Sequence, residues 1–218
     1  MKKIMFDDRF CMTQAVLDKL KDRTRRLVPQ KILDAADAYV QRVHGTGNDF
    51  LDYLLAHAPY KVGEVVAVAQ SYLELGIEFV DHADPTFRRK HVPKWGFTQR
   101  MKGWKNKMYV RADVMPHQIR FTDIRVERIQ NISDEDCIKE GIEEDAPYYW
   151  VPINRALPNW RKMHEAVSDM YPGRDGKVCA HFWDSPKKAF SALFKKLYGK
   201  KVWDDNPYVY VYAFELVK

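Results

Sequence analysis

Cysteine is scarce in this sequence of 218 residues, which removes two common ways of stabilising a small domain. The three cysteines, Cys11, Cys137 and Cys179, are odd in number and far apart, and none belongs to a CxxC pair. Disulfide frameworks use an even number of cysteines, and structural zinc sites use closely spaced ones. We therefore expect neither, and interpret the protein as one of a reducing, cytoplasmic compartment.

Long apolar runs are also missing. A membrane-spanning helix needs about 18 or more consecutive apolar residues, and no segment approaches that length. Only three apolar residues lie between the two N-terminal lysines and Asp7, which is too few for the core of a signal peptide. We therefore expect no membrane segment and no secretory signal.

The motifs that bind common cofactors are absent as well. The sequence contains no glycine-rich phosphate loop, no dinucleotide fingerprint and no HExxH, and its seven histidines are scattered. Such motifs supply phosphate cradles or metal ligands at a fixed spacing. We therefore expect no bound cofactor and no metal.

The composition is that of a folded, mildly basic protein. Hydrophobic residues make up 46% of the chain and aromatic residues 13%, which is enough for a packed core. The 36 lysines and arginines exceed the 30 aspartates and glutamates, so that the formal net charge is +6. A positive charge of this size suits an anionic partner such as a nucleic acid.

The first half of the chain has local patterns of helices and of strands in a curved sheet. Residues 30–57 are typical of one or two helices. Residues 61–70 start with a turn at Gly63 and continue with a short β-branched run, which predicts a buried strand. In residues 117–130 the apolar positions alternate, but the phase changes at Thr122–Asp123, which predicts a β-bulge.

The second half adds two capped helices and a final strand. Ser133 and Gly141 are suited to begin and end a helix, as are Ser185 and Gly199. Residues 208–217 alternate tyrosine with valine, which is typical of a strand whose tyrosines form core or an exposed stacking surface. The order of these elements predicts an α+β fold with a curved or closed sheet.

Two segments combine basic residues with chemistry that suits nucleic acids. The stretch "LKDRTRR" (20–26) places a threonine among cations. The stretch "HVPKWGFTQRMKGWKNK" (91–107) interleaves Trp95 and Trp104 with lysines and arginines, as single-strand binders do. A carboxylate at Glu140, just before the expected end of a helix, is opposed by the helix dipole and is a further functional candidate.

The sequence resembles the ASCH family (activating signal cointegrator homology), and in particular its phage and prophage branch. Four stretches carry the resemblance: "AVLDKLKDRTRR" (15–26), "YKVGEVVAVAQSY" (60–72), "MPHQIRFTDIRVERIQNISDEDCIKEGI" (115–142) and "AFSALFKKLYGKKVWDDNPYVYVYAFELV" (189–217). They indicate a single ASCH-like domain over 1–218, with divergent inserts at about 28–59, 73–104 and 143–184.

The resemblance implies a PUA-like β-barrel with flanking helices and a cleft that binds RNA or a modified nucleotide. Some small members of the family hydrolyse N4-acetylcytidine with a lysine, a threonine and a glutamate. These residues match Lys21, Thr24 and Glu140 of this sequence. Further residues expected to contact nucleic acid are Arg23, Arg25, Arg26, Gln70, Trp104, Lys105, Lys107 and Arg111.

Asp22 distinguishes this sequence from the family motif, which has a threonine after the lysine. A threonine hydroxyl becomes a nucleophile when a base removes its proton, and a lysine of lowered pKa is such a base. Asp22 would keep Lys21 protonated if the two side chains met, which favours phosphate binding over catalysis.

Three functions follow from these observations. The first is binding of RNA or a modified nucleotide through cations, with affinity that falls as salt rises. The second is deacylation of N4-acetylcytidine by the same cleft. The third is a phage-derived interaction protein that binds a protein partner through residues 73–104 or 143–184.

Overall fold

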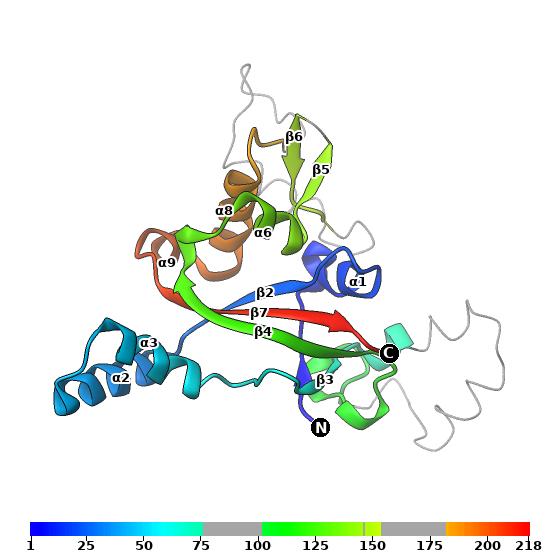
Figure 1. Cartoon of the computed structure of the whole chain (residues 1–218). Helices are drawn as coiled ribbons and strands as arrows, with labels where there is room; N and C mark the ends of the chain where they lie inside the picture. The colour runs from blue at the N-terminus through cyan, green and yellow to red at the C-terminus, as the bar shows by residue number, and fades with distance from the viewer. Residues whose placement is uncertain (76–101, 146, 154–181) are drawn as a thin grey trace.

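A five-stranded mixed sheet forms the centre of the protein. The computed structural model describes residues 1–75, 102–145, 147–153 and 182–218. The strand order is β1-β3-β4-β7-β2, where β1 and β3 run parallel and the other neighbours are antiparallel. The strands are β1 (Lys3–Ile4), β2 (Arg23–Leu27), β3 (Val65–Val68), β4 (Gln118–Arg128) and β7 (Tyr208–Leu216). Strands β4 and β7 curve together through the middle of the molecule (Figure 1).

The expected α+β class is confirmed, but the sheet is open in the part of the chain that the structure describes. Strands β1 and β2 lie at opposite ends of the strand order, and no ladder joins them among these residues. The closed form of the expected barrel is therefore not observed there.

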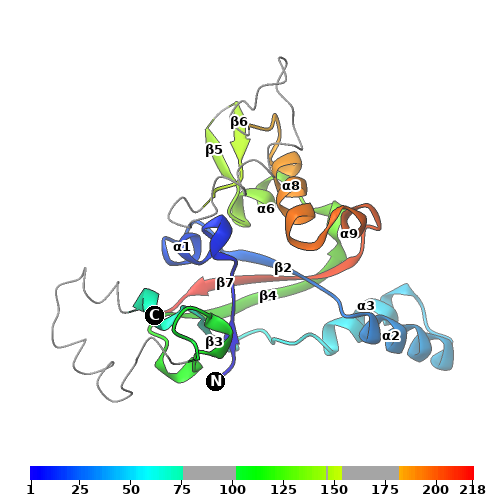
Figure 2. The same ribbon diagram turned by 180° about the vertical axis from the view of Figure 1, so that it is seen from behind.

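The bulge expected near Thr122 is confirmed. The register between β4 and β7 shifts between Phe121 and Asp123, where an extra residue of β4 has no partner in β7. A bulge of this kind bends the strand and increases its twist. It accounts for the sweep of β4 seen from both sides of the molecule (Figures 1 and 2).

The two capped helices also form as predicted. The Ser133 side chain accepts a hydrogen bond from the Asp136 backbone and begins α6, and Ser185 does the same for α8. Gly141 and Gly199, at φ of 97° and 96°, follow the two helices in a conformation that suits glycine. The C-terminal helices are α6 (Asp134–Lys139), α8 (Pro186–Tyr198) and α9 (Lys200–Asp204). Between them, β5 (Glu143–Asp145) and β6 (Tyr148–Trp150) form a small hairpin.

Both faces of β7 contribute to buried cores. The helices α6, α8 and α9 contribute to the core that contains Val209 and Val211. The opposite face contains Tyr210 and Tyr212, packed with residues of α1 (Met12–Leu17) and α3 (Gly47–Ala56). Tyr210 and Tyr212 are therefore core residues with no exposed surface to offer a base, whereas Tyr208 is half-buried.

The region 30–57 forms two helices, as predicted. Helices α2 (Gln30–Val43) and α3 pack against each other and project from the sheet as an arm (Figures 1 and 2). Among the described residues, no helix is both long and apolar enough to cross a membrane.

Candidate functional site

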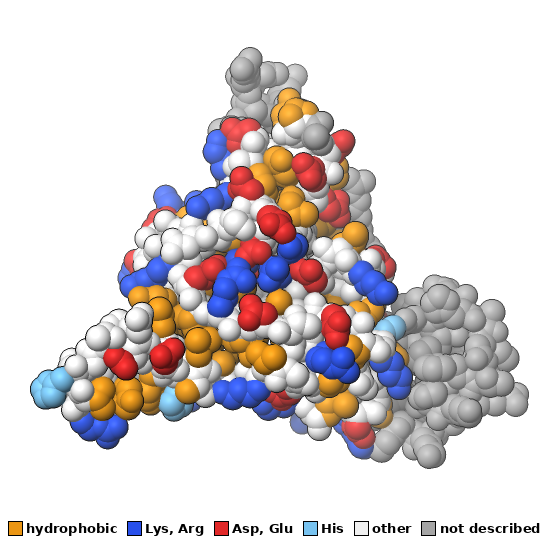
Figure 3. Space-filling model, viewed as in Figure 1, with side chains coloured by type: hydrophobic (Ala, Val, Ile, Leu, Met, Phe, Trp, Pro, Cys, Tyr) orange, Lys and Arg blue, Asp and Glu red, His pale blue; other side chains and the backbone are white. Residues whose placement is uncertain are grey.

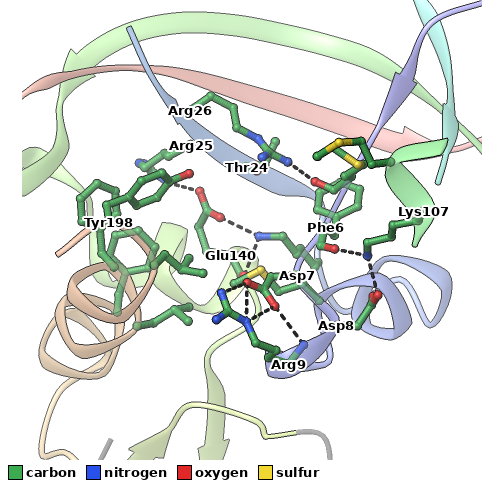
Figure 4. A pocket seen from close by; sticks show the side chains of 18 of the residues that line it. Phe6, Asp7, Asp8, Arg9, Thr24, Arg25, Arg26, Lys107, Glu140 and Tyr198 are labelled. Atoms are coloured by element: carbon green, nitrogen blue, oxygen red, sulfur yellow. Dashed lines mark hydrogen bonds and ion pairs between the residues drawn. The ribbon is translucent and has the colours of Figure 1, made fainter. Parts of the chain in front are cut away.

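A cavity of about 760 Å³ lies at the outer edge of β2. Lys21, Thr24, Arg25, Arg26 and Glu140 all line it. Its wall also includes apolar side chains from the N-terminal segment, from residues 106–108 and from α8: Met5, Phe6, Met12, Met108, Phe190, Leu193, Phe194, Leu197 and Tyr198. The sequence-predicted catalytic residues are thus brought together in one cavity (Figure 4).

The edge position of β2 explains why neighbouring residues line the same cavity. Thr24 pairs with Tyr212, and Arg25 pairs with Val211, so the two side chains leave opposite faces of the sheet. Because the described residues place only β7 beside β2, a cavity at its free edge is reached from both faces. Neighbouring residues of β2 therefore supply both a hydroxyl, from Thr24, and guanidinium groups, from Arg25 and Arg26, to one cavity.

Lys21 and Glu140 form a buried ion pair inside this cavity. The Lys21 ammonium nitrogen lies 2.6 Å from Glu140 Oε2 and 2.6 Å from the Glu140 backbone oxygen. The side chains are 1% and 6% exposed. Burial lowers the pKa of Lys21, and although Glu140 opposes this, the nearby charges of Arg26 and Arg25 reinforce it. Lys21 therefore releases its proton more easily than an ordinary lysine.

Local backbone geometry delivers these two side chains to each other. Glu140 is the C-cap of α6, and the next residue, Gly141, turns the chain away from the helix. The Lys21 backbone N–H is bonded to the Ala15 carbonyl at the end of α1. The Asp22 N–H is bonded to the Lys139 carbonyl, which fixes the start of β2 against the end of α6.

Arg25 connects Glu140 to two further carboxylates. Its guanidinium lies 3.1 Å from Glu140 Oε1, 2.7 Å from Glu127 Oε1 and 2.6 Å from Asp136 Oδ2. The Arg25 side chain is 1% exposed. Burial disfavours its charge, but the three carboxylates outweigh burial and raise the pKa of Arg25. Both oxygens of Glu140 are thus held by cations, which fixes the carboxylate in place.

The network continues to the surface. Arg23 lies 2.9 Å from Asp136, and Arg125 contacts both Asp136 and Glu127. Figure 3 shows blue and red side chains intermixed in the middle of the face it views. Charges of both signs therefore alternate here, and the surface is not a continuous positive patch.

The Asp22 side chain does not pair with Lys21, although the sequence placed the two next to each other and Asp22 would keep Lys21 protonated if they met. The Asp22 side chain is exposed, whereas Lys21 is buried with Glu140. Backbone hydrogen bonds to Lys139 and Phe214 hold Asp22 at the start of the strand. Asp22 therefore does not act on the protonation of Lys21, and the carboxylate that opposes the lowered pKa of Lys21 is Glu140.

Most of the predicted phosphate-binding cations at this edge have protein partners. Arg23 and Arg25 bind carboxylates, and Arg26 donates to the Met5 carbonyl at 2.6 Å. Lys107 lines the cavity, as predicted, but pairs with Asp8 at 2.7 Å and donates to the Phe6 carbonyl. These groups hold the cavity wall together, which leaves them less available to phosphate.

The other predicted nucleic-acid contacts do not line the cavity. Gln70 is buried, Trp104 packs against a separate core cluster, and Lys105 is exposed. Arg111 contacts Asp113 and donates its backbone N–H to the Tyr72 hydroxyl. Their role in binding stays a prediction, and Trp95 lies outside the described residues.

Several residues of the site carry no recognisable signal in the sequence. Glu127 and Asp136 hold Arg25, and Tyr198 closes the α8 side of the cavity. Asp7 and Arg9 form an ion pair at its N-terminal side. Their roles follow from distant parts of the chain that meet only in the folded protein.

No metal-binding cluster of histidine, cysteine, aspartate or glutamate occurs among the residues that the structure describes. Comparisons with protein-family models, with curated proteins and with solved structures give no match to this chain.

Proposed function

We propose that the cavity binds a modified nucleoside or nucleotide and that Thr24, Lys21 and Glu140 hydrolyse an N-acyl group on it. The observation that carries the proposal is the buried Lys21–Glu140 pair, which shares the cavity with the Thr24 hydroxyl. The resemblance to the ASCH family adds the substrate class, an N4-acylated cytidine.

The size and lining of the cavity suit such a ligand. Small-molecule sites usually measure about 300–1,000 Å³ and combine apolar walls with a few polar groups. Here, Phe190 and Phe194 of α8 contribute to the apolar wall, while Thr24 and Arg26 contribute polar groups. A planar base has apolar faces and polar edges, so both parts of this lining have a partner on it.

The ion pairs favour this ligand over an extended RNA backbone at the same edge. Arg25 is buried among three carboxylates, and Lys21 is held by Glu140. A phosphate would have to displace these carboxylates, whose proximity already satisfies the cations. We therefore rank a small-molecule site above a phosphate clamp at β2.

The proposed reaction begins at the Thr24 hydroxyl. Neutral Lys21 accepts the hydroxyl proton as the Thr24 oxygen bonds to the acyl carbon. The amide C–N bond then breaks, and protonated Lys21 returns the proton to the leaving amine of the base. Water hydrolyses the acyl-threonine ester to a carboxylic acid, and Glu140 keeps the Lys21 amine oriented throughout.

The register of β2 adds a donor for the developing oxyanion. Val28 donates its N–H to the Tyr208 carbonyl, and Asp22 accepts from the Phe214 N–H. In an antiparallel ladder, residues whose backbone groups bond to the partner strand alternate with residues whose backbone groups point away from it. The backbone groups of Thr24 therefore face β7, as do those of Asp22 and Val28, and the Arg25 N–H points to the free edge of β2. An N–H beside the nucleophile is well placed to stabilise an oxyanion.

The test is incubation of the full chain with N4-acetylcytidine, followed by chromatography of cytidine and acetate. Thr24→Ala and Lys21→Ala are expected to lower kcat/KM by about 10²-fold or more, because each removes a group that moves or receives the transferred atoms. Thr122→Ala and Lys19→Ala are the matched controls, since both residues are exposed and neither is among the residues that line the cavity. Unchanged activity in both site variants would contradict the assignment.

Binding without hydrolysis is the second candidate, and the apolar wall of the cavity favours it, because such a wall suits a base whether or not a bond is broken. Calorimetric titration with cytidine and N4-acetylcytidine would then give saturable binding that Arg26→Ala weakens, with no product formed. Interaction through residues 73–104 or 143–184 remains a third hypothesis, although those segments lie largely outside the described residues.

A further inference from the structure

A second hollow, of about 290 Å³, lies beside α8 and α9. Among the described residues, its lining consists of Trp183, Lys187, Lys188, Ser191, Ala192, Lys195 and Trp203. No carboxylate is among these residues. Three ammonium groups and a hydroxyl therefore surround a floor of mostly buried indoles, which are 3% and 9% exposed.

Lysines are concentrated on this part of the chain. Six of them occur in three adjacent pairs between positions 187 and 201: Lys187 and Lys188, Lys195 and Lys196, and Lys200 and Lys201. Lys188 pairs with Asp184 at 2.7 Å, and Lys195 lies 5.7 Å from the centre of the Trp203 ring. The other four form no ion pair with any residue in the described ranges.

This arrangement is the opposite of the one at β2. There, Arg25 is satisfied by three buried carboxylates. On α8 and α9, the carboxylates closest in sequence, Asp184, Asp204 and Asp205, do not line the hollow. Among the described residues, α8 and α9 therefore carry a group of lysines most of which have no carboxylate partner.

The spacing of the lysines fits an extended ligand. Lys187 and Lys195 lie on one face of α8, and eight residues of helix span about 12 Å. The charges along one strand of a DNA duplex repeat about every 3.4 Å of the helix axis, and they lie farther apart on an extended single strand, so this face can meet more than one phosphate. Lys200 and Lys201 begin α9, which follows α8 in the chain and packs against it.

We propose that the lysine face of α8 and α9 binds the phosphate backbone of a single-stranded nucleic acid. An ammonium group is a point charge that binds phosphate without requiring a fixed geometry. The opposite side of α8 lines the large cavity with Phe190, Leu193 and Phe194. One helix thus separates the two sites, and the backbone-binding face stands whether or not the cavity hydrolyses an acyl group.

A membrane surface fits this face less well. Helices that bind membranes place large exposed apolar side chains beside their lysines. In α8, the large apolar residues Phe190, Leu193 and Phe194 are buried in the protein. The face therefore offers charge without an apolar surface to insert.

The experiment titrates the full chain into a fluorescein-labelled oligouridine strand and measures fluorescence anisotropy between about 50 and 200 mM KCl. Wild-type affinity is expected to fall steeply as salt rises. Lys187→Ala/Lys195→Ala is expected to make the slope of log K against log salt less negative by about 1.4, or about 0.7 for each lost phosphate contact. Lys200→Ala/Lys201→Ala changes only exposed residues and is expected to act in the same direction.

The control variant Lys31→Ala/Lys218→Ala removes the same charge from exposed positions outside this face and is expected to keep the wild-type slope. Circular dichroism verifies that all variants fold. Absence of binding at low salt, or an equal loss in the control, would overturn the proposal. So would stronger binding to phosphatidylserine vesicles than to the strand, or displacement of the strand by polyglutamate at equal charge.

Discussion

Lys21 and Glu140 are 119 residues apart in the sequence, and their side chains meet at 2.6 Å in the interior. Each is almost fully buried, and Arg25 holds the second oxygen of the carboxylate. Burying charges costs more than their attraction returns unless the pairing is complete. Two apolar side chains at these positions would often stabilise the fold as well or better. We therefore infer that the ion pair beside the cavity serves a function rather than stability.

Lys21→Met is expected to destabilise the fold by about 3–5 kcal/mol, because it leaves the Glu140 carboxylate buried with less compensation. The double variant Lys21→Met/Glu140→Leu is expected to recover much of this loss. Urea unfolding of the four members of the cycle measures the coupling. Arg120→Met is the control: its partner Glu215 is 53% exposed, and such pairs contribute about 0–1 kcal/mol. Equal effects at the two sites would contradict the importance of burial.

The rate of N-acyl hydrolysis is expected to rise with pH. Lys21 must be neutral to accept the Thr24 proton, and burial places its pKa below the ordinary 10.5. The midpoint of kcat/KM against pH should therefore lie below 10.5. Lys19→Ala should leave the midpoint in place, because Lys19 is exposed. A rate that is independent of pH would exclude Lys21 as the base.

Asp136 is expected to contribute to acid sensitivity. Burial disfavours its ionised form, but Arg25, Arg125 and Arg23 outweigh burial and hold its pKa below the ordinary 3.8. The resulting stabilisation is complete above about pH 4 and is lost as the pH falls through the folded-state pKa. Unfolding free energies measured from pH 6 downwards should fall less steeply for Asp136→Asn than for wild type. An equal slope would show that other carboxylates dominate.

Gly141→Ala is expected to destabilise the protein by about 1–3 kcal/mol, because φ at this position is +97°. The added methyl would lie 3.7 Å from Lys21 Cδ, an ordinary contact, so the cost comes from the backbone. Gly47→Ala is the matched control, since nothing lies within 4 Å of its added carbon. Thermal denaturation compares the two, and equal shifts would show that the helix end tolerates a side chain.

Local patterns predicted the elements whose boundaries depend on neighbouring residues. Ser133 and Ser185 begin helices because their hydroxyls accept from backbone groups three residues ahead. The phase change at Thr122–Asp123 became a bulge because side chains alternate strictly along a strand. The type and order of these elements were enough to predict an α+β fold.

The relations between distant segments needed the folded chain. Asp22 is adjacent to Lys21 in the sequence, yet the partner of Lys21 is Glu140. Likewise, the arginines of "LKDRTRR" resemble a phosphate clamp until Glu127 and Asp136 are found beside Arg25. The charge pattern along the chain cannot predict these ion pairs, because Glu127 lies in β4 and Asp136 in α6, both far from β2 in the sequence.

The sequence by itself thus determined the helices, the bulge and the residue types available for chemistry, since each depends on interactions a few residues apart. The tertiary structure decided which charges are satisfied and which remain open to a ligand. The physical reason is burial: once β2 packs against α6, an unpaired lysine or arginine is too costly to keep, and the pairing follows from proximity in space.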